Sequence, residues 1–235
     1  MNSGILTVMQ LNLRNLSLPY FQTASLFVIN FFVFATQAIM VMRGVNMSDT
    51  VGLGMGWIFS FLIPLAALYI PTNNFRRIIN LGGKRRDYFW GSLVTYAVLA
   101  CAASLIGVIV HYAEDLIATS IDPFSNIVAL SDVFGWSAHN PIVAFFQQLA
   151  FLFLLATFVH TLATMRNKWY GWVTYITLFT VVLVFTNTMS LQSKIAWFFN
   201  LLTSHDNALL QIVSCVVLAM VIYMFSKPVI ARTTT

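Results

Sequence analysis

The stretch that decides the fold is PTNNFRRIINLGGKRRDYFW, residues 71–90, which holds five of the chain's twelve basic residues. It lies between two long apolar runs, at about residues 52–70 and 89–111. A basic loop between two membrane-length segments is typical of the cytoplasmic side of a membrane protein. We therefore predict that residues 71–90 join two membrane spans on the cytoplasmic side.

A short helix is predicted at about residues 73–83 of this loop. Asn73 and Asn74 are of a residue type that caps helix N-termini, and apolar residues follow at the helical spacing of three and four. These apolar residues are Phe75, Ile78, Ile79 and Leu81. Gly82 and Gly83 are expected to end the helix, because glycine readily adopts the positive φ that helix ends require.

The overall composition excludes a soluble globular protein. The chain has 235 residues, of which 59% are hydrophobic and only 8% are charged, and its mean hydropathy is +0.83. Soluble domains carry about 25% charged residues. The net charge of +5 is spread over several short loops instead of one face, so it does not indicate a nucleic-acid partner.

Hydrophobic patterning predicts an all-α integral membrane protein in a single transmembrane domain, residues 1–235. Residues 4–20 are amphipathic and too polar to span, so they are expected to form a helix in the inner interface that Pro19 ends. Six spans of about 20 residues each would follow. Their approximate bounds are 22–42, 52–70, 89–111, 142–164, 171–190 and 208–226.

The distribution of charge over the loops predicts the orientation of these spans. With the N-terminus inside, ten of the twelve basic residues fall on the inner side, and only Arg43 and Lys194 fall outside. Acidic residues divide the opposite way, with only Asp87 inside. Because basic loops stay in the cytoplasm, both termini are predicted to be cytoplasmic.

Sequence motifs for catalysis are missing. Gly82-Gly83-Lys84-Arg85 lacks the GxxxxGK[ST] spacing of a phosphate-binding loop, and neither HExxH nor GxSxG occurs. The four histidines fall in different segments without metal-ligand spacing. We therefore predict no catalytic residue, no metal site and no cofactor in this chain. For His160, near the inner end of a span, structural packing is favoured over a role in proton relay.

The spans contain neutral polar residues but no ionisable residue at their centres, which argues against an ion-coupled pump. Two interpretations remain open: hydrogen bonds between helices, which are favoured, and a weakly polar lining for an amphipathic passenger. The residues in question are Asn30, Gln37, Gln147, Gln148, Asn187 and Gln211.

Residues 75–89, FRRIINLGGKRRDYF, resemble a pattern of the membrane subunits of ABC-2-type transporters, a short apolar helix followed by Leu-Gly, two variable positions, Arg and an aromatic. The resemblance implies a six-span fold with a cytoplasmic coupling helix that fits a groove of a separate ATPase, which binds ATP and Mg. It also implies a second transmembrane subunit, identical or homologous. The size of the chain is similar to that of bacterial exporters of peptides, bacteriocins or drug-like compounds, such as phenol-soluble modulin exporters. This resemblance implies a location in the cytoplasmic membrane of a bacterium.

On this resemblance, the residues that contact the ATPase are expected to lie at positions 74–85. Phe75, Ile78 and Ile79 would form an exposed apolar knob, and the arginines would pair with acidic groups of the ATPase or with anionic membrane lipid. The full set is Asn74, Phe75, Arg76, Arg77, Ile78, Ile79, Leu81, Gly82, Gly83 and Arg85. The alternative hypothesis is a membrane scaffold or immunity protein that transports nothing, and an intramembrane enzyme is disfavoured by the missing motifs.

Overall fold

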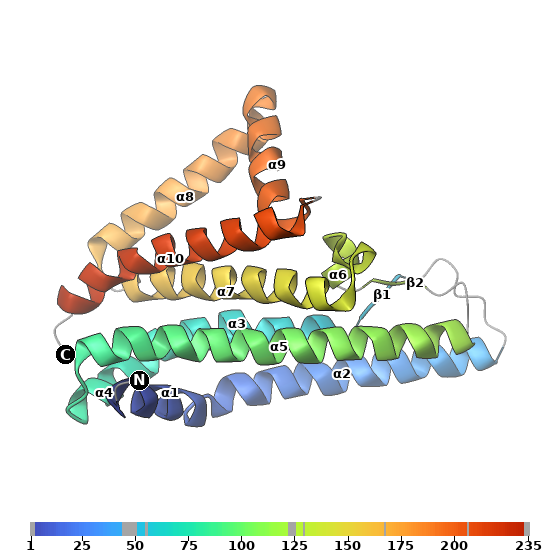
Figure 1. Ribbon diagram of the computed structural model, residues 1–235, viewed down its shortest axis with the longest axis horizontal. Helices are drawn as coiled ribbons and strands as arrows, with labels where there is room; N and C mark the ends of the chain where they lie inside the picture. Colours follow the sequence, from blue (N-terminus) through green and yellow to red (C-terminus); the bar gives the residue numbers. More distant parts are fainter. Residues whose placement is uncertain are drawn as a thin grey trace.

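The computed structural model describes residues 3–43, 51–54, 56–121, 126–128, 130–166, 168–205 and 207–232. These residues are predominantly helical (Figure 1). The elements are α1 (Ser3–Arg14), α2 (Ser17–Met42), β1 (Val51–Leu53), α3 (Gly56–Tyr69), the π-helical turn η1 (Ile70–Asn74), α4 (Phe75–Asn80), α5 (Arg85–Ile121), β2 (Asn126–Val128), α6 (Leu130–Val133), the 3-10 turn η2 (Trp136–Ala138), α7 (Pro141–Met165), α8 (Trp169–Asn187), α9 (Met189–Thr203) and α10 (Ala208–Arg232).

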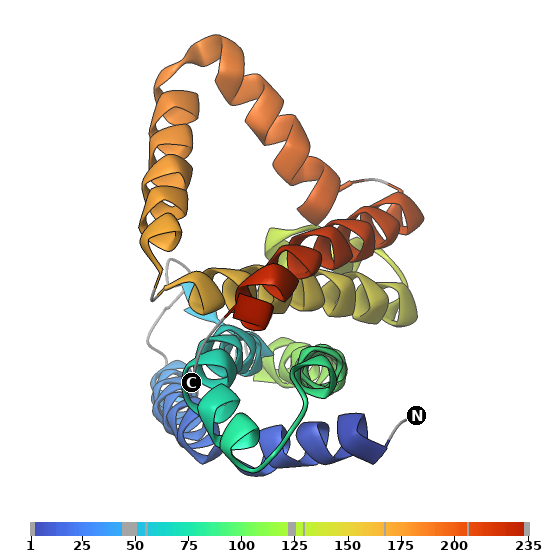
Figure 2. The same cartoon turned by 90° about the vertical axis from the view of Figure 1, so that its left-hand side faces the viewer.

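The core of the molecule is a bundle of long helices centred on α7, which packs against α10, α5 and α3. Helix α2 covers α3, and α1 lies against the start of α5 (Figure 1). Helices α8 and α9 form an arm that leaves the bundle after α7 and returns to it at α10 (Figure 2). A feature not expected from the sequence is a parallel pair of three-residue strands, in which Val51 pairs with Asn126.

Four of the described helices are long and apolar enough to cross a membrane: Gly56–Asn80, Arg85–Leu116, Pro141–Met165 and Ala208–Ile230. A fifth is counted if α1 and the start of α2, which meet at a bend of 44°, are taken as one span. The apolar stretch of α8, Gly171–Val184, is shorter than a span. The structure therefore supports a helical membrane protein with four or five candidate spans, and the sixth span remains a prediction.

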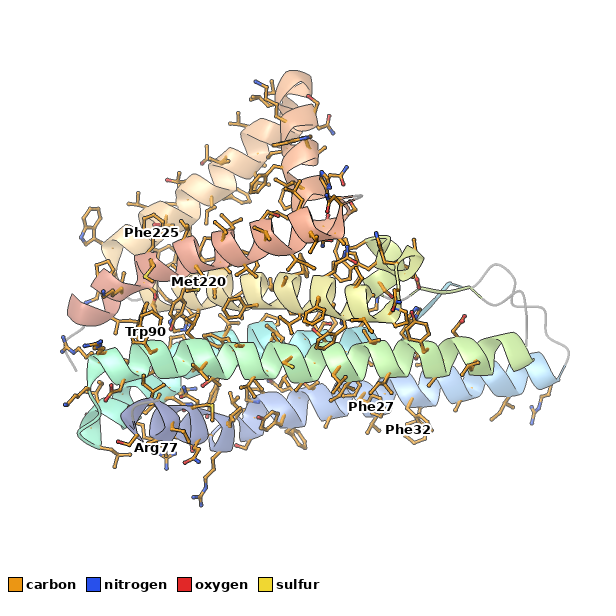
Figure 3. The ribbon with its side chains drawn as sticks, in the orientation of Figure 1. Phe27, Phe32, Arg77, Trp90, Met220 and Phe225 are labelled. Carbon is orange, nitrogen blue, oxygen red and sulfur yellow. The ribbon has the colours of Figure 1, made fainter. Side chains whose placement is uncertain are left out.

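The outer surface of the bundle is strongly apolar. On α2, Phe32 is 63% exposed, and on α10, Phe225 is 62% exposed; Figure 3 shows both side chains away from the central helix α7. Soluble proteins rarely expose large contiguous apolar patches, whereas side chains that face lipid need no polar covering. The exterior is therefore suited to a bilayer.

The break between α1 and α2 lies earlier than predicted. Helix α1 ends at Arg14 and α2 begins at Ser17, so the expected interfacial helix at 4–20 is shorter than predicted. Pro19 does not end a helix: it lies in the first turn of α2, where proline is tolerated because the N–H it lacks would have no helical partner.

The predicted coupling helix at 73–83 is the end of a longer helix. α3, η1 and α4 follow one another without a break, so Gly56–Asn80 forms one helix of 25 residues. The π-helical turn at 70–74 accommodates Pro71, whose ring would clash in a regular helix. The prediction that Asn74 caps a new helix is wrong, because its side chain makes no capping hydrogen bond there.

Candidate functional site at the basic end of the bundle

One end of the bundle collects most of the basic residues. Helices α1 and α4, the start of α5 and the ends of α7 and α10 lie together at this end (Figure 1). They carry Arg14, Arg76, Arg77, Lys84, Arg85, Arg86, Arg166, Lys168 and Lys227. The far end of α5 and the neighbouring α6 carry Glu114, Asp115 and Asp132 instead. In membrane proteins an excess of Lys and Arg is typical of the cytoplasmic side.

Two of the residues expected to form an exposed knob are buried at this end. Phe75 is 6% exposed and Ile78 only 2%. The ring of Phe75 packs edge-on against Tyr88 of α5, with 4.9 Å between ring centroids. The prediction of an exposed apolar knob is therefore wrong for these two residues, since both belong to the core of the chain. Ile79 is half-buried, and Leu81 is 68% exposed.

A buried asparagine joins three segments of the chain beneath this surface. The side-chain amide of Asn74 donates a hydrogen bond of 3.1 Å to Oδ1 of Asn12 on α1. Nδ2 of Asn12 lies 3.4 Å from the hydroxyls of both Ser92 and Thr95 on α5. Asn12 is fully buried, so this network fixes α1 and η1 to α5. The sequence indicates this network only in part. Val8, Asn12 and Leu16 follow one another at a spacing of four, as residues on one helical face do, and all three are buried.

The close approach of α1 to α5 depends on Gly91. A Cβ atom at position 91 would lie 2.6 Å from Cγ1 of Val8 and 3.1 Å from the carbonyl oxygen of Ile5. The first separation is too short for non-bonded carbon atoms, and the second is tighter than most Cβ contacts. The glycine thus lets the two helix backbones come together near the buried asparagine network.

The end of α4 is confirmed as a glycine terminator. The N–H of Gly82 donates to the carbonyl of Ile79, and the N–H of Gly83 donates to that of Ile78, each over 2.9 Å. This pair of bonds is a Schellman motif, with Gly82 in the left-handed region at φ 82°. The motif turns the chain sharply into α5, so that the basic residues 84–86 follow α4 directly.

The basic residues of α5 and α10 line a hollow on the same end. Arg85, Arg86 and Lys227 border a cavity of about 430 Å³ together with Phe89, Trp90 and Ile230. Of these residues only Arg85 is predicted from the sequence as a contact, because Lys227 lies on α10, far away in the chain. The cavity can take an anionic side chain between its cations and its aromatic wall.

Those polar residues of the proposed transport path whose side chains the structure describes do not form one lining. Gln147 on α7 donates a hydrogen bond of 2.6 Å to Gln211 on α10, and Gln211 in turn donates to the carbonyls of Leu202 and Thr203, each over 3.1 Å. Gln148 is buried beside Gly107 of α5, and Asn30 is half-buried on α2. The side chains of Gln37 and Asn187 lie outside the described residues. For Gln147 and Gln211, hydrogen bonding between helices is confirmed.

Replacing Gln211 by leucine is expected to destabilise the contact between α7 and α10 by about 1 kcal/mol, the usual value for polar contacts inside membrane proteins. The loss arises because Nε2 of Gln147 is left without its partner. Thermal unfolding of the purified protein in detergent measures it, with Val213→Leu on the exposed face of α10 as the control. Equal stability of both variants would contradict the structural role.

His160 is held in an aromatic cluster, as the packing interpretation predicted. It is fully buried on α7, its Nδ1 lies 2.7 Å from the hydroxyl of Tyr96 on α5, and its ring packs on Tyr223 of α10 at 5.1 Å. The Tyr223 hydroxyl donates to the carbonyl of Phe89 over 2.6 Å. These contacts tie three helices together just below the basic end.

Among the described residues, no group of three or more His, Cys, Asp or Glu side chains is placed to hold a metal ion. Comparisons of the chain with known protein families, with curated proteins and with solved structures found no match. The assignment of a function to the basic end therefore rests on its own geometry and on the sequence pattern.

Proposed function

We propose that this chain is the transmembrane subunit of an ATP-driven exporter whose ATPase is a separate cytoplasmic protein. The observation that carries the proposal is the rigid attachment of the basic end to the spans. Arg76 and Arg77, which are exposed there, belong to the continuous helix Gly56–Asn80, one of the candidate spans, and the exposed Leu81 follows it directly. A protein bound at this end can therefore move the spans, which is what an external energy source requires.

The path of such a movement follows the contacts described above. A force on Arg76 or Leu81 would act on α4, which is packed through Phe75 on Tyr88 at the start of α5. The asparagine network carries the same force to α1. Helices α4, α5 and α1 would shift as one body, because the close-packed core between them does not deform continuously.

The surface offered to the ATPase is polar and positively charged, with one apolar residue. Arg76, Arg77 and Lys84 are exposed beside Leu81, which is 68% exposed. Such a surface fits an acidic groove with a small apolar patch. Of the residues proposed from the sequence, Phe75 and Ile78 support this surface from beneath and do not contact the partner.

The remaining parts of the proposal concern topology and assembly. The chain would cross the cytoplasmic membrane of a bacterium six times, with both termini inside, and would pair with a second transmembrane subunit. The large exposed apolar residues of α8, among them Trp172, Ile176 and Phe179, offer surface for lipid or for that subunit. The cargo would be amphipathic or hydrophobic and would pass between subunits, because Gln147 and Gln211 are engaged with each other within one chain.

The second candidate is a membrane scaffold or immunity protein that transports nothing. It is favoured by the same glutamine pair, since the polar residues available for a path are used to hold α7 to α10. The two functions differ in one requirement. An exporter subunit must bind an ATPase at the basic end, whereas a scaffold need not.

The test is co-purification of the tagged chain with an ABC-type ATPase encoded next to it. The double variant Arg76→Glu/Leu81→Asp reverses the charge at position 76 and replaces the apolar side chain at position 81 with a charged one. It is expected to reduce ATPase binding at least about tenfold, the equivalent of about 1.4 kcal/mol. Both side chains are exposed, so the fold should persist. Lys194→Glu on α9, away from the basic end, is the matched control. Retention of the ATPase by the double variant, or no binding by the wild type, would favour the scaffold.

A further inference from the structure

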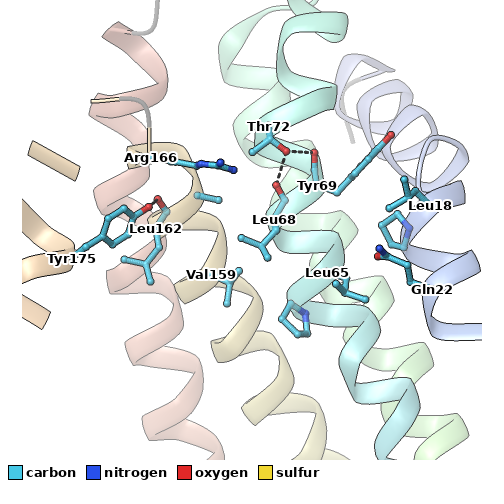
Figure 4. Close-up of a pocket in the computed structure, with 13 residues that line it drawn as sticks. Leu18, Gln22, Leu65, Leu68, Tyr69, Thr72, Val159, Leu162, Arg166 and Tyr175 are labelled. Atoms are coloured by element: carbon cyan, nitrogen blue, oxygen red, sulfur yellow. Dashed lines mark hydrogen bonds between the residues drawn. The ribbon is translucent and has the colours of Figure 1, made fainter. Parts of the chain in front are cut away.

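A second hollow near the basic end opens on the side of the bundle. It is a groove of about 540 Å³ between α2, α3, α7 and α8 (Figure 4). Its walls are mostly apolar and include Leu18, Leu65, Leu68, Val159 and Leu162. Its position on the flank of two candidate spans, Gly56–Asn80 and Pro141–Met165, means that it opens toward the bilayer.

Two polar side chains, Arg166 and Thr72, lie at the end of the groove nearest the basic residues, and Gln22, Tyr69 and Tyr175 also line it. Arg166, in the turn that closes α7, extends toward Thr72 on the facing helix (Figure 4). The Thr72 hydroxyl donates to the carbonyls of Leu68 and Tyr69 over 2.8 and 3.1 Å, and its oxygen remains able to accept a bond. Within the part of the chain that the structure describes, no acidic side chain forms an ion pair with Arg166.

The length of the groove matches part of a lipid chain. The residues that line it on α3 and η1 run from Pro64 to Thr72, and those on α7 run from Val159 to Arg166. At a rise of about 1.5 Å per residue, these segments are roughly 10–12 Å long. One leaflet of the hydrocarbon core is about 15 Å thick, half of the whole. The apolar wall therefore follows most of one acyl chain below a cation at the level of the headgroup.

We propose that this groove binds one phospholipid with an anionic headgroup, whose phosphate contacts the guanidinium of Arg166 and whose acyl chain lies along Leu68 and Val159. Arginine is suited to this role because its planar fork binds phosphate through two parallel hydrogen bonds. A free anion would make no use of the apolar wall, and a purely apolar ligand would leave the guanidinium without a partner. The proposal does not depend on export and requires only a membrane around the bundle.

Lipid titration of the full-length protein, followed by native mass spectrometry from detergent, tests this proposal. The probes are phosphatidylglycerol, which is anionic, and phosphatidylcholine, which is zwitterionic. We expect the wild type to retain one phosphatidylglycerol saturably and to prefer it over phosphatidylcholine. Arg166→Gln should weaken this binding about fivefold, as expected for one basic residue at a membrane surface, and Arg166→Lys should restore part of it.

Matched controls separate the groove from general attraction to a basic surface. Lys168→Gln removes a charge from the same loop without lining the groove, so it should leave binding unchanged. Leu68→Trp should fill the groove and abolish binding, whereas Leu105→Trp, on the exposed face of α5, should not. Thermal unfolding of each variant verifies that it is folded.

Four results would overturn the proposal. Equal losses in Arg166→Gln and Lys168→Gln would indicate surface attraction alone, and unchanged binding in a folded Leu68→Trp variant would exclude the groove. Displacement of the lipid by an excess of inorganic phosphate would mean that the anion, and not the lipid, is the ligand. Failure of the wild type to retain phosphatidylglycerol would reject the site directly.

Discussion

Replacing Phe75 with alanine is expected to lower the free energy of unfolding by about 3–5 kcal/mol, the range found when a buried phenylalanine is truncated. The ring is 6% exposed and packs on Tyr88 with 4.9 Å between centroids, so its removal leaves a cavity between α4 and α5. Chemical or thermal unfolding of the purified protein in detergent measures the loss.

The control for this result is Leu81→Ala, six residues further along the same segment. Leu81 is 68% exposed, and surface substitutions usually change stability by no more than about 0.5 kcal/mol. If Phe75→Ala were as stable as Leu81→Ala, then Phe75 would not be in the core. In that case the earlier expectation of an exposed knob at 75–79 would return.

Replacing Asn12 with alanine is expected to cost about 1–3 kcal/mol, because it leaves the buried amide of Asn74 without its acceptor. The hydroxyls of Ser92 and Thr95 lose their donor as well. The loss should be local at first: α1 should separate from α5 before the bundle unfolds. Limited proteolysis near the turn at residues 15–16 therefore reports it, together with the unfolding temperature.

Gln10→Ala is the matched control for Asn12, since Gln10 lies on the exposed face of the same helix. The two substitutions change the helix propensity of α1 in the same direction, because alanine is the best helix former in both cases. Asparagine is the poorer helix former of the two, so Asn12→Ala gains more helix propensity than Gln10→Ala, and a greater loss in Asn12→Ala is therefore due to the buried network. Equal protease sensitivity of the two variants would show that the network does not hold α1.

The local sequence pattern predicted the features that depend on neighbours in the chain. Each of the six predicted apolar runs coincides largely with a helix of the structure: α2, α3, α5, α7, α8 and α10. Gly82 and Gly83 ended α4 as predicted, because a helix terminator is determined by the residues beside it. The separation of basic and acidic residues between the two ends of the bundle follows from the same pattern.

The features that the sequence did not predict depend on contacts between distant residues. Phe75 and Ile78 lie among arginines, so they seemed exposed, but the aromatic ring that covers Phe75 comes from the next helix. Gln147 and Gln211 are 64 residues apart, and spacing along one helix cannot show that they meet. Asn74 is predicted to be a helix cap from its residue type alone. Its actual partner, Asn12, is far away in the chain, so the local pattern does not reveal their hydrogen bond.

The bond between Asn12 and Ser92 has a consequence for the order in which the protein is assembled. The two residues are 80 positions apart, so the surface on which α1 docks does not exist until α5 has been synthesised and inserted. Closing so long a loop also carries a larger entropic cost than pairing adjacent helices. Helix α1 is thus expected to reach its final position only after α5, although it precedes α5 in the chain.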